Sequence, residues 1–214
     1  MSATVTRGQM VEIAQKALAD ETGTKFPPDT IRQFAQNSIQ RWNQFFAVED
    51  SQTIALTTDV RTYSLTSYTG LRRVKEIEYP ASDDPPRALT CRHVHDPEGF
   101  YGGLYWDTRG TPPTTLIMGP SPTTGESLTL RYWRAAAYPS DDGTLLEVPD
   151  EDINCLKEDI VTQAMEYLAH KEAQNAGPSG FALSQLGTEA LRRRRNLLEE
   201  YRTLRASRES YLYY

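Results

Sequence analysis

The stretch IMGPSPTTGESLTLRYWRAA, residues 117–136, decides the fold class of this chain. Two apolar runs flank a turn that contains Pro120, Pro122 and Gly125, and the second run alternates apolar with polar residues. Such alternation is typical of a strand with one face toward water and the other toward a core. The stretch therefore predicts a β-hairpin whose second strand is half exposed.

Further strands are expected before this hairpin, because short runs rich in Thr, Val, Ile and Tyr alternate there with polar or glycine-containing turns. The runs are TIALTT, RTYSLT and RVKEIEY, at residues 53–58, 61–66 and 73–79. Between them and the hairpin, residues 82–113 are rich in proline and glycine, which excludes a long regular element. Parallel pairing would require helical crossovers that this stretch lacks, so we expect an antiparallel sheet or a small sandwich.

Helical patterns precede and follow the strands. Thr6 and Gln9 have the spacing of a capping box, and Pro27, Pro28 and Asp29 have the character of a helix start. The second helix should bury one apolar, aromatic-rich stripe, which comprises Ile31, Phe34, Ala35, Ile39, Trp42, Phe45 and Phe46. A third helix is expected from Asp150 to the breaker at Gly177 and Pro178, and a fourth over about residues 181–207.

These patterns predict an α+β fold, in which a helical bundle built from both chain ends carries an inserted antiparallel β module. The expected divisions are residues 1–50 for the N-terminal helical hairpin of the bundle and 51–149 for the β module. Residues 150–214 then supply the C-terminal helices and a terminal tail.

Composition excludes several classes of protein. The 214-residue chain has a net charge of -6 and a pI near 5.2, which argues against a freestanding duplex-binding protein, since phosphate neutralisation requires a basic face. No apolar run approaches the roughly 18 residues that a membrane span requires. The start lacks a signal-peptide pattern, so we expect a cytoplasmic origin and reduced thiols at Cys91 and Cys155.

Candidate catalytic and metal-binding residues have simpler explanations in this sequence. His93, His95 and Asp96 lack a further strong ligand at sensible spacing and resemble an ordinary turn, so neither a metal nor a cofactor is expected. The pairs Asp83–Asp84 and Asp141–Asp142 lie beside proline or glycine, where aspartate commonly bonds to the turn backbone. No nucleophile elbow or phosphate loop is present, and we expect no enzymatic activity.

The C-terminal helix and tail contain the residues that we single out for partner binding. Arg192, Arg193, Arg194 and Arg195 cover a full helical turn. They either form a solvated face paired with Glu189, Glu199 and Glu200, or dock onto an acidic protein surface or a nucleic-acid passage. The tail, Tyr211, Leu212, Tyr213 and Tyr214, either folds back on its own bundle or is buried in a partner, because tyrosine is enriched at interface hot spots.

The assembled pattern resembles the head-to-tail adaptor (connector) proteins of tailed bacteriophages. The similarity covers most of the chain, from an N-terminal helical hairpin with an aromatic second helix to a long basic final helix. Between them it rests on YSLT, RRVKEIEY, LIMGPSP, LTLRYWRAA and the acidic helix LLEVPDEDINCLKEDIVTQAMEYLA.

The resemblance implies a structural role in the neck of the virion, after assembly in the host cytoplasm. Adaptors of this kind form a homo-oligomeric ring on the portal protein, twelvefold in the best-known cases, and present a platform to a tail or stopper protein. They extend the channel for genomic DNA, which passes without sequence-specific binding, and no membrane is involved. The arginines 192–195 and the tail 211–214 would then dock on the portal. An acidic third helix and a basic fourth would suit contacts between subunits.

Two other kinds of function remain open from the sequence. The first is a neighbouring neck component, either a tail completion protein or a second neck ring protein, which would share the same assembly logic. The second is a carbohydrate- or peptide-binding β module, because the tyrosines and the tryptophan of GFYGGLYWD, residues 99–107, have rings that can stack on sugars.

Overall fold

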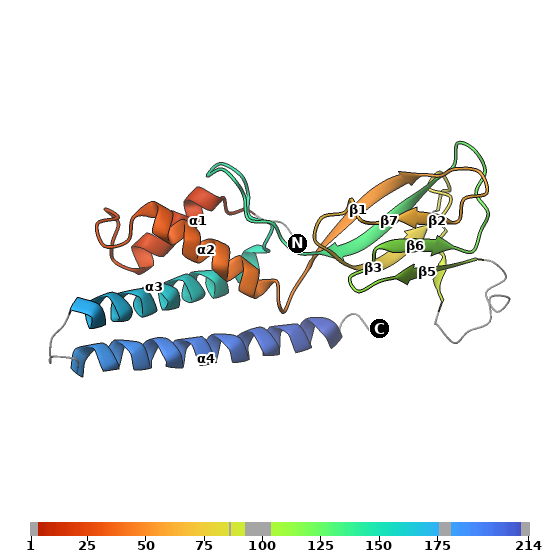
Figure 1. Cartoon of the computed structure of the whole chain (residues 1–214). Coiled ribbons are helices and arrows are strands. Elements are labelled where there is room, and N and C mark those ends of the chain that lie inside the picture. Colours follow the sequence, from red (N-terminus) through yellow and green to blue (C-terminus); the bar gives the residue numbers. More distant parts are fainter. Residues whose placement is uncertain (1–3, 86, 93–103, 176–180, 211–214) are drawn as a thin grey trace. The chain divides into compact units, whose positions relative to one another are not determined.

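Helices and strands are segregated along the chain. The computed structural model describes residues 4–85, 87–92, 104–175 and 181–210, and its helices and two sheets confirm the α+β class. The chain divides into two compact units (Figure 1). Met1–Phe46 and Ala136–Tyr214 belong to the first, here called the helical unit, and Ala47–Ala135 form the second, the β unit.

The N-terminal helices begin where the sequence predicts. Helix α1 spans Arg7–Ala17, and its capping box is complete: the Thr6 hydroxyl accepts from the Gln9 backbone N–H at 3.2 Å, and the Gln9 side chain accepts from the Thr6 N–H at 2.9 Å. Helix α2 spans Pro28–Trp42 with proline in its first turn. Between them, the Asp20 carboxylate accepts three backbone N–H groups of residues 24–26, which fixes the connection.

The apolar stripe of α2 and the residues after it form the centre of the helical unit. Ile31, Ala35, Ile39, Trp42 and Phe46 are buried, which confirms most of the predicted stripe, whereas Phe34 and Phe45 are half-buried. The buried rings contact one another: Trp42 and Phe46 have centroids 5.2 Å apart, and Phe46 meets Tyr201 edge-on at 5.8 Å. An aromatic cluster thus joins the N-terminal helices to the C-terminal one.

The C-terminal helices are longer than those at the N-terminus. A short 3₁₀ turn, η2 (Asp150–Asp152), precedes α3, which spans Ile153–Asn175, so the α-helix itself begins three residues after the predicted start. Helix α4 spans Phe181–Ser210. Helix α3 packs against α1, α2 and α4, and it lies between α2 and α4 (Figure 1).

The chain leaves the helical unit after Phe46 and returns at Ala136, and the side chain of Asn43 marks this point. The Asn43 carboxamide donates to the Ala136 carbonyl at 2.9 Å and accepts from the Ala136 N–H at 2.8 Å. Asn43 is itself buried, so both halves of its amide are satisfied by one backbone residue. The first residue of the returning chain is therefore fixed to the end of α2.

The β unit consists of two sheets. Their strands are β1 (Val48–Ala55), β2 (Thr62–Ser64), β3 (Leu71–Glu78), β4 (Thr90–Cys91), β5 (Tyr105–Arg109), β6 (Thr115–Met118) and β7 (Ser127–Arg134). The first sheet has the order β1-β7-β3 and is antiparallel. The second has the order β2-β6-β5-β4.

The predicted hairpin of residues 117–136 is wrong, because its two strands belong to different sheets. β6 pairs with β2 and β5, whereas β7 pairs with β1 and β3. The eight residues between them, 119–126, contain two prolines and are bonded elsewhere: the Gly119 N–H donates to the Tyr105 carbonyl, and the Asp59 N–H donates to the Pro122 carbonyl. Gly125 supplies the positive φ, +90°, that the turn requires. The connection therefore crosses from one sheet to the other.

The prediction of a purely antiparallel module is also corrected. β4 and β5 pair in parallel, with Thr90 opposite Tyr105 and Cys91 opposite Trp106. Residues 92–104 separate the two strands, a connection of the length that parallel pairing requires. β5 itself lies in the proline- and glycine-rich stretch for which the sequence predicted no long element.

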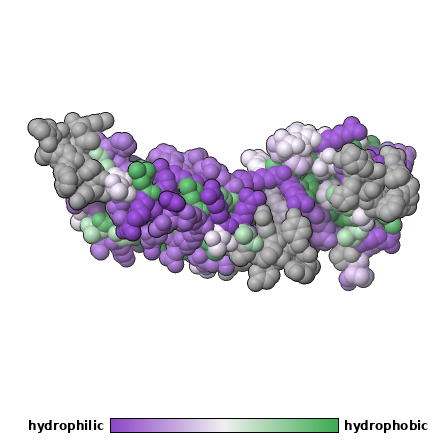
Figure 2. Space-filling model, turned by 90° about the horizontal axis from the view of Figure 1, so that it is seen from below, coloured by the Kyte–Doolittle hydropathy of each residue, from purple (hydrophilic) through white to green (hydrophobic). Residues whose placement is uncertain are grey.

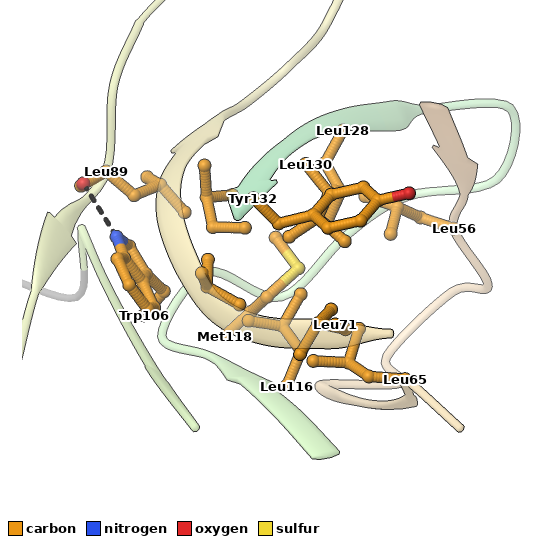
Figure 3. Close-up of a cluster of buried hydrophobic side chains, with 12 residues drawn as sticks. Leu56, Leu65, Leu71, Leu89, Trp106, Leu116, Met118, Leu128, Leu130 and Tyr132 are labelled. Carbon is orange, nitrogen blue, oxygen red and sulfur yellow. Dashed lines mark hydrogen bonds between the residues drawn. The ribbon is translucent and has the colours of Figure 1, made fainter. Parts of the chain in front are cut away.

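The core of the β unit lies between its two sheets. β7 alternates as predicted: Leu128, Leu130 and Tyr132 are buried, while the intervening Thr129 and Arg131 are partly exposed. These buried side chains converge with Leu116 and Met118 of β6 (Figure 3) and with the other members of the cluster, Leu56, Leu65, Leu71, Val74, Ile77, Leu89 and Trp106. The half-exposed strand is therefore the centre of a sheet that covers one side of this core.

Candidate partner-binding surface

Helix α4 is held against the rest of the helical unit by one face. Ala190, Leu197 and Tyr201 are all at most 3% exposed and follow one another at helical spacing. Tyr201 contacts Phe45 and Phe46 with ring centroids 5.5 and 5.8 Å apart. Burial raises the pKa of its hydroxyl far above the ordinary value, so Tyr201 is neutral. This face leaves the opposite side of α4 without contacts to α3.

Two of the four predicted arginines tie α4 to α3. Arg193 Nη1 lies 3.4 Å from Glu158 Oε2, and Arg194 Nη2 donates to Glu166 Oε2 at 2.5 Å. Both glutamates are on α3, and the side chain of Arg194 is 35% exposed. Arg193 also donates to Glu189 of its own helix at 3.1 Å, and its side chain is 41% exposed, so the contact with α3 through Arg194 is the more buried of the two.

The other two arginines point into solvent. Arg192 donates two hydrogen bonds of 2.9 Å to the carboxylate of Glu189, one turn earlier, and these bonds raise the pKa of its guanidinium. Arg195 lies 3.5 Å from Glu199, and its side chain is 82% exposed. The predicted pairing with Glu189 and Glu199 is confirmed for these residues. Glu200, the third predicted partner, instead accepts from the Cys155 thiol at 3.4 Å.

The exposed side of α4 combines leucines with arginines. Leu191 is 65% exposed, and Arg195, Leu198 and Arg202 follow it at spacings of four, three and four residues, so they share one face. A shallow hollow on this face is lined by these four residues together with Arg194 and Glu199. We call Leu191, Arg195, Leu198 and Arg202 the outer stripe. Seen from the side of α4, this part of the surface is largely hydrophilic with a few hydrophobic patches (Figure 2).

The acidic residues of α3 are mostly used within the chain. Glu158 and Glu166 pair with α4, as described above, and Asp159 is fully buried beside Arg41 of α2. Burial raises the pKa of Asp159, and the nearby charge of Arg41 opposes that rise. The expected attraction between an acidic third helix and a basic fourth is therefore satisfied, at least for these residues, within a single chain.

The carboxylate pairs proposed from the sequence occupy turns, as predicted. The Asp141 carboxylate accepts from the Gly143 N–H at 3.0 Å and the Thr144 hydroxyl at 2.6 Å, as in an Asx turn. Asp142 does more than cap a turn, because it accepts from Arg7 at 2.7 Å and from Arg32 at 2.5 Å. In the second pair, the Asp83 N–H donates to the Pro80 carbonyl.

Several other sequence-based candidates are buried or lie outside the described residues. Trp106 and Tyr105, two of the three rings that prompted the sugar-binding alternative, are buried in the β unit, and the third, Tyr101, lies outside the described residues. The Trp106 indole N–H donates to the Leu89 carbonyl at 3.1 Å (Figure 3). Neither buried ring can stack on a sugar there. Two other sets of candidates lie outside the described residues: the group His93, His95 and Asp96, and the whole tail, residues 211–214. Within the described part of the chain, no three His, Cys, Asp or Glu side chains are placed to hold a metal ion.

Comparison with known families decides the class of the protein. The family model described as SU10 adaptor protein matches residues 6–209, nearly the whole chain and both of its units. The chain belongs to the SU10 adaptor protein family. Membership in this phage adaptor family supports the resemblance seen in the sequence and implies that the protein is a component of the virion and interacts with other phage structural proteins. No curated protein matches the chain significantly. In the portion of the chain that the structure describes, no helix has the length and apolar character of a membrane span.

Proposed function

We propose that this protein forms a ring that joins the portal to the tail in the neck of the virion and extends the DNA channel. The observation that carries the proposal is the family match over residues 6–209. The role is structural and not catalytic. By analogy with the adaptors it resembles, we propose a twelvefold ring that assembles on the portal in the host cytoplasm and receives a tail or stopper protein.

The distribution of charge supports passage of DNA without tight binding. The chain has a net charge of -6, and two of the four clustered arginines, Arg193 and Arg194, are engaged with glutamates of α3. Strong neutralisation of phosphates would hold a duplex in place, because affinity rises with each phosphate that is contacted. A channel with few free cations allows the genome to slide.

The proposed contacts with the portal involve Arg192 of the arginine cluster, together with Tyr211 to Tyr214, while Arg195 is a second exposed arginine of this cluster. Arg192 and Arg195 are 69% and 82% exposed, and their partners Glu189 and Glu199 lie on the same helix. Such exposed pairs within one helix contribute little to stability, so an incoming carboxylate can replace the partner at little cost. Arg193 and Arg194 contribute by holding α4 in place.

Electron microscopy of the purified chain mixed with its portal tests the proposal. We expect a ring on the face of the portal that receives the tail, coaxial with the portal channel. A ring found only at a later position, bound to another neck protein and not to the portal, would instead identify a second neck ring or tail completion protein. A chain that binds neither the portal nor any neck component would refute the adaptor role.

A further inference from the structure

We propose that the outer stripe of α4 is the docking site for a second copy of this chain, which contributes an acidic segment from the opposite side of its helical unit. The segment comprises residues 141–151, DDGTLLEVPDE, and is called the acidic segment below. This inference rests on the proposed ring and names the two surfaces that meet in it.

The basic half of the contact has an apolar centre and a charged edge. Leu191 is the most exposed large apolar side chain among the described residues of the helical unit, at 65%. Arg195 is 82% exposed, and Arg202 has no ion-pair partner among the described residues. A leucine flanked by arginines gains most when it meets another apolar side chain that is flanked by carboxylates.

The acidic segment has this composition. It contains five acidic residues and no lysine, arginine or histidine. Its centre is Leu145, which is 48% exposed. Asp142 is neutralised by Arg7 and Arg32, but Asp141 and Asp150 are exposed and bond only to neutral groups, Asp150 to Thr4 and Asp141 to its own turn. The segment thus presents an exposed leucine among carboxylates, of which Asp150 bonds only to neutral groups, while Asp141 lies near the positive charge of Arg7.

The backbone of the acidic segment is held in place before any partner arrives. The Arg7 and Gly8 N–H groups donate to the carbonyls of Thr144 and Asp142 at 3.0 Å, and the Leu146 N–H donates to the Val5 carbonyl at 2.9 Å. Leu145 therefore occupies a bridge position opposite Thr6 and is exposed on an ordered backbone. Binding to such a preformed surface requires little additional ordering.

The two surfaces cannot satisfy each other within one chain. The acidic segment bonds to the start of α1 and to Arg32 of α2, whereas α4 packs on α3, which lies between them (Figure 1). Two different and complementary surfaces on opposite sides of one unit give a heterologous, head-to-tail contact, and repetition of that contact generates a ring when the rotation closes. The contact is therefore of the kind that the proposed ring requires.

Two substitutions test the contact separately: Leu191→Glu in the outer stripe and Leu145→Glu in the acidic segment. Both side chains are exposed, so each variant should keep the wild-type circular dichroism spectrum and melting temperature. Self-association, measured by sedimentation velocity and native mass spectrometry, should weaken roughly tenfold or more in each variant. Val60→Glu, which changes an exposed apolar side chain of the β unit, should associate as the wild type does.

Mixing the two variants tests whether the contact is head-to-tail. Each retains one intact surface, so the mixture should form a one-to-one heterodimer and nothing larger. Variants that assemble like the wild type, a mixture that stays monomeric, or a wild-type chain that is monomeric even at millimolar concentration would each overturn the inference.

The same variants separate this inference from the proposed function. If Leu191→Glu forms normal assemblies but no longer binds the portal, the outer stripe serves the portal and the inference is wrong, while the adaptor role stands. If both substitutions abolish assembly and the wild-type assembly nevertheless ignores the portal, the contact is right and the adaptor role is wrong.

Discussion

The indole N–H of Trp42, at the end of α2, donates a hydrogen bond of 2.8 Å to the carboxylate of Asp152, in the turn that leads into α3. Both side chains are 1% exposed. The bond joins residues 110 positions apart and fixes the N-terminal helices to the start of the C-terminal ones. Because a buried carboxylate without a partner is costly, this contact fixes the orientation of the tryptophan as well as contributing to stability.

Trp42→Ala should destabilise the protein by about 3–5 kcal/mol, since it removes a large buried ring and leaves a cavity. Trp42→Phe should cost less, because it keeps most of the packing. It should still destabilise the protein by about 1–3 kcal/mol, because Asp152 loses this hydrogen-bond donor. Urea unfolding followed by far-UV circular dichroism measures both. Trp133→Phe, at a partly exposed position in the β unit, is the control. Equal stability of Trp42→Ala and the wild type would contradict the burial seen here.

Replacing Arg41 should show how much the buried Asp159 carboxylate lowers the free energy of unfolding when its cationic partner is absent. Arg41→Met leaves the fully buried carboxylate without its cationic partner and should destabilise the helical unit by about 3–5 kcal/mol at neutral pH. Because burial raises the pKa of Asp159, the folded state binds a proton more readily than the unfolded state, so stability is lost as the pH rises through the folded pKa. The defect of Arg41→Met should therefore shrink as the pH is lowered.

The double variant Arg41→Met, Asp159→Leu is the matched control for this pair. It removes both charges, so its stability should recover toward that of the wild type and depend less on pH than that of the single variant. A single variant whose defect is independent of pH would show that Asp159 is not the source of the cost.

The contribution of Asp142 to stability should depend on pH in the opposite way to that of Asp159. Hydrogen bonds from Arg32 and Arg7 lower the pKa of its carboxyl below the usual 3.8. Its contribution is therefore complete above the unfolded value of 3.8 and is lost as the pH falls through the lower folded pKa. Asp142→Asn should be less stable than the wild type at neutral pH, and the difference should narrow in acid. Asp29→Asn, which removes the 91% exposed partner of Arg32, should have little effect at any pH.

The four clustered arginines should separate into two pairs. Replacing Arg193 and Arg194 by glutamine removes the ion pairs with α3 and should lower stability by about 0.5–1 kcal/mol. Replacing Arg192 and Arg195, whose partners are on their own helix, should leave the stability unchanged and weaken assembly of the ring on the portal. Chemical unfolding and co-sedimentation with the portal measure the two effects. An identical result for both pairs would show that position on the helix is irrelevant.

Deletion of residues 211–214 should weaken docking on the portal without unfolding the subunit. The expected reason is that a terminal segment with three tyrosines in four residues gains stability from a partner's pocket. Thermal melting of the truncated chain and its co-sedimentation with the portal provide the measurement. A truncated chain that melts well below the full-length protein would show that the tail belongs to its own core.

The sequence predicted best those elements that are governed by neighbouring residues. The capping box at Thr6, the start of α2 at Pro28 and the alternation along β7 are each set by spacings of two to four residues. The predicted burial of Trp42 is confirmed. It too follows from local spacing, because apolar residues at helical spacing place one face of the helix against the core.

Long-range partners were beyond the reach of the same reasoning. The sequence shows an eight-residue turn after β6 but not that β7 pairs with β1, more than 70 residues earlier. Likewise, β5 lies among glycines and prolines and owes its place to Trp106, whose ring completes the core and whose N–H bonds to Leu89. The sequence also could not predict which arginines of the cluster contact α3, because this depends on Glu158 and Glu166, which are about 30 residues away in the chain.

The two hydrogen bonds between Asn43 and Ala136 hold together the two chain segments between which the β unit is inserted. Whatever lies between residues 47 and 135, the helices meet the outgoing and returning chain at one fixed point. A β unit that is attached in this manner can be reshaped or replaced while the helical unit stays the same. The surface that the β unit offers to other molecules can therefore change in evolution independently of the packing between the helices.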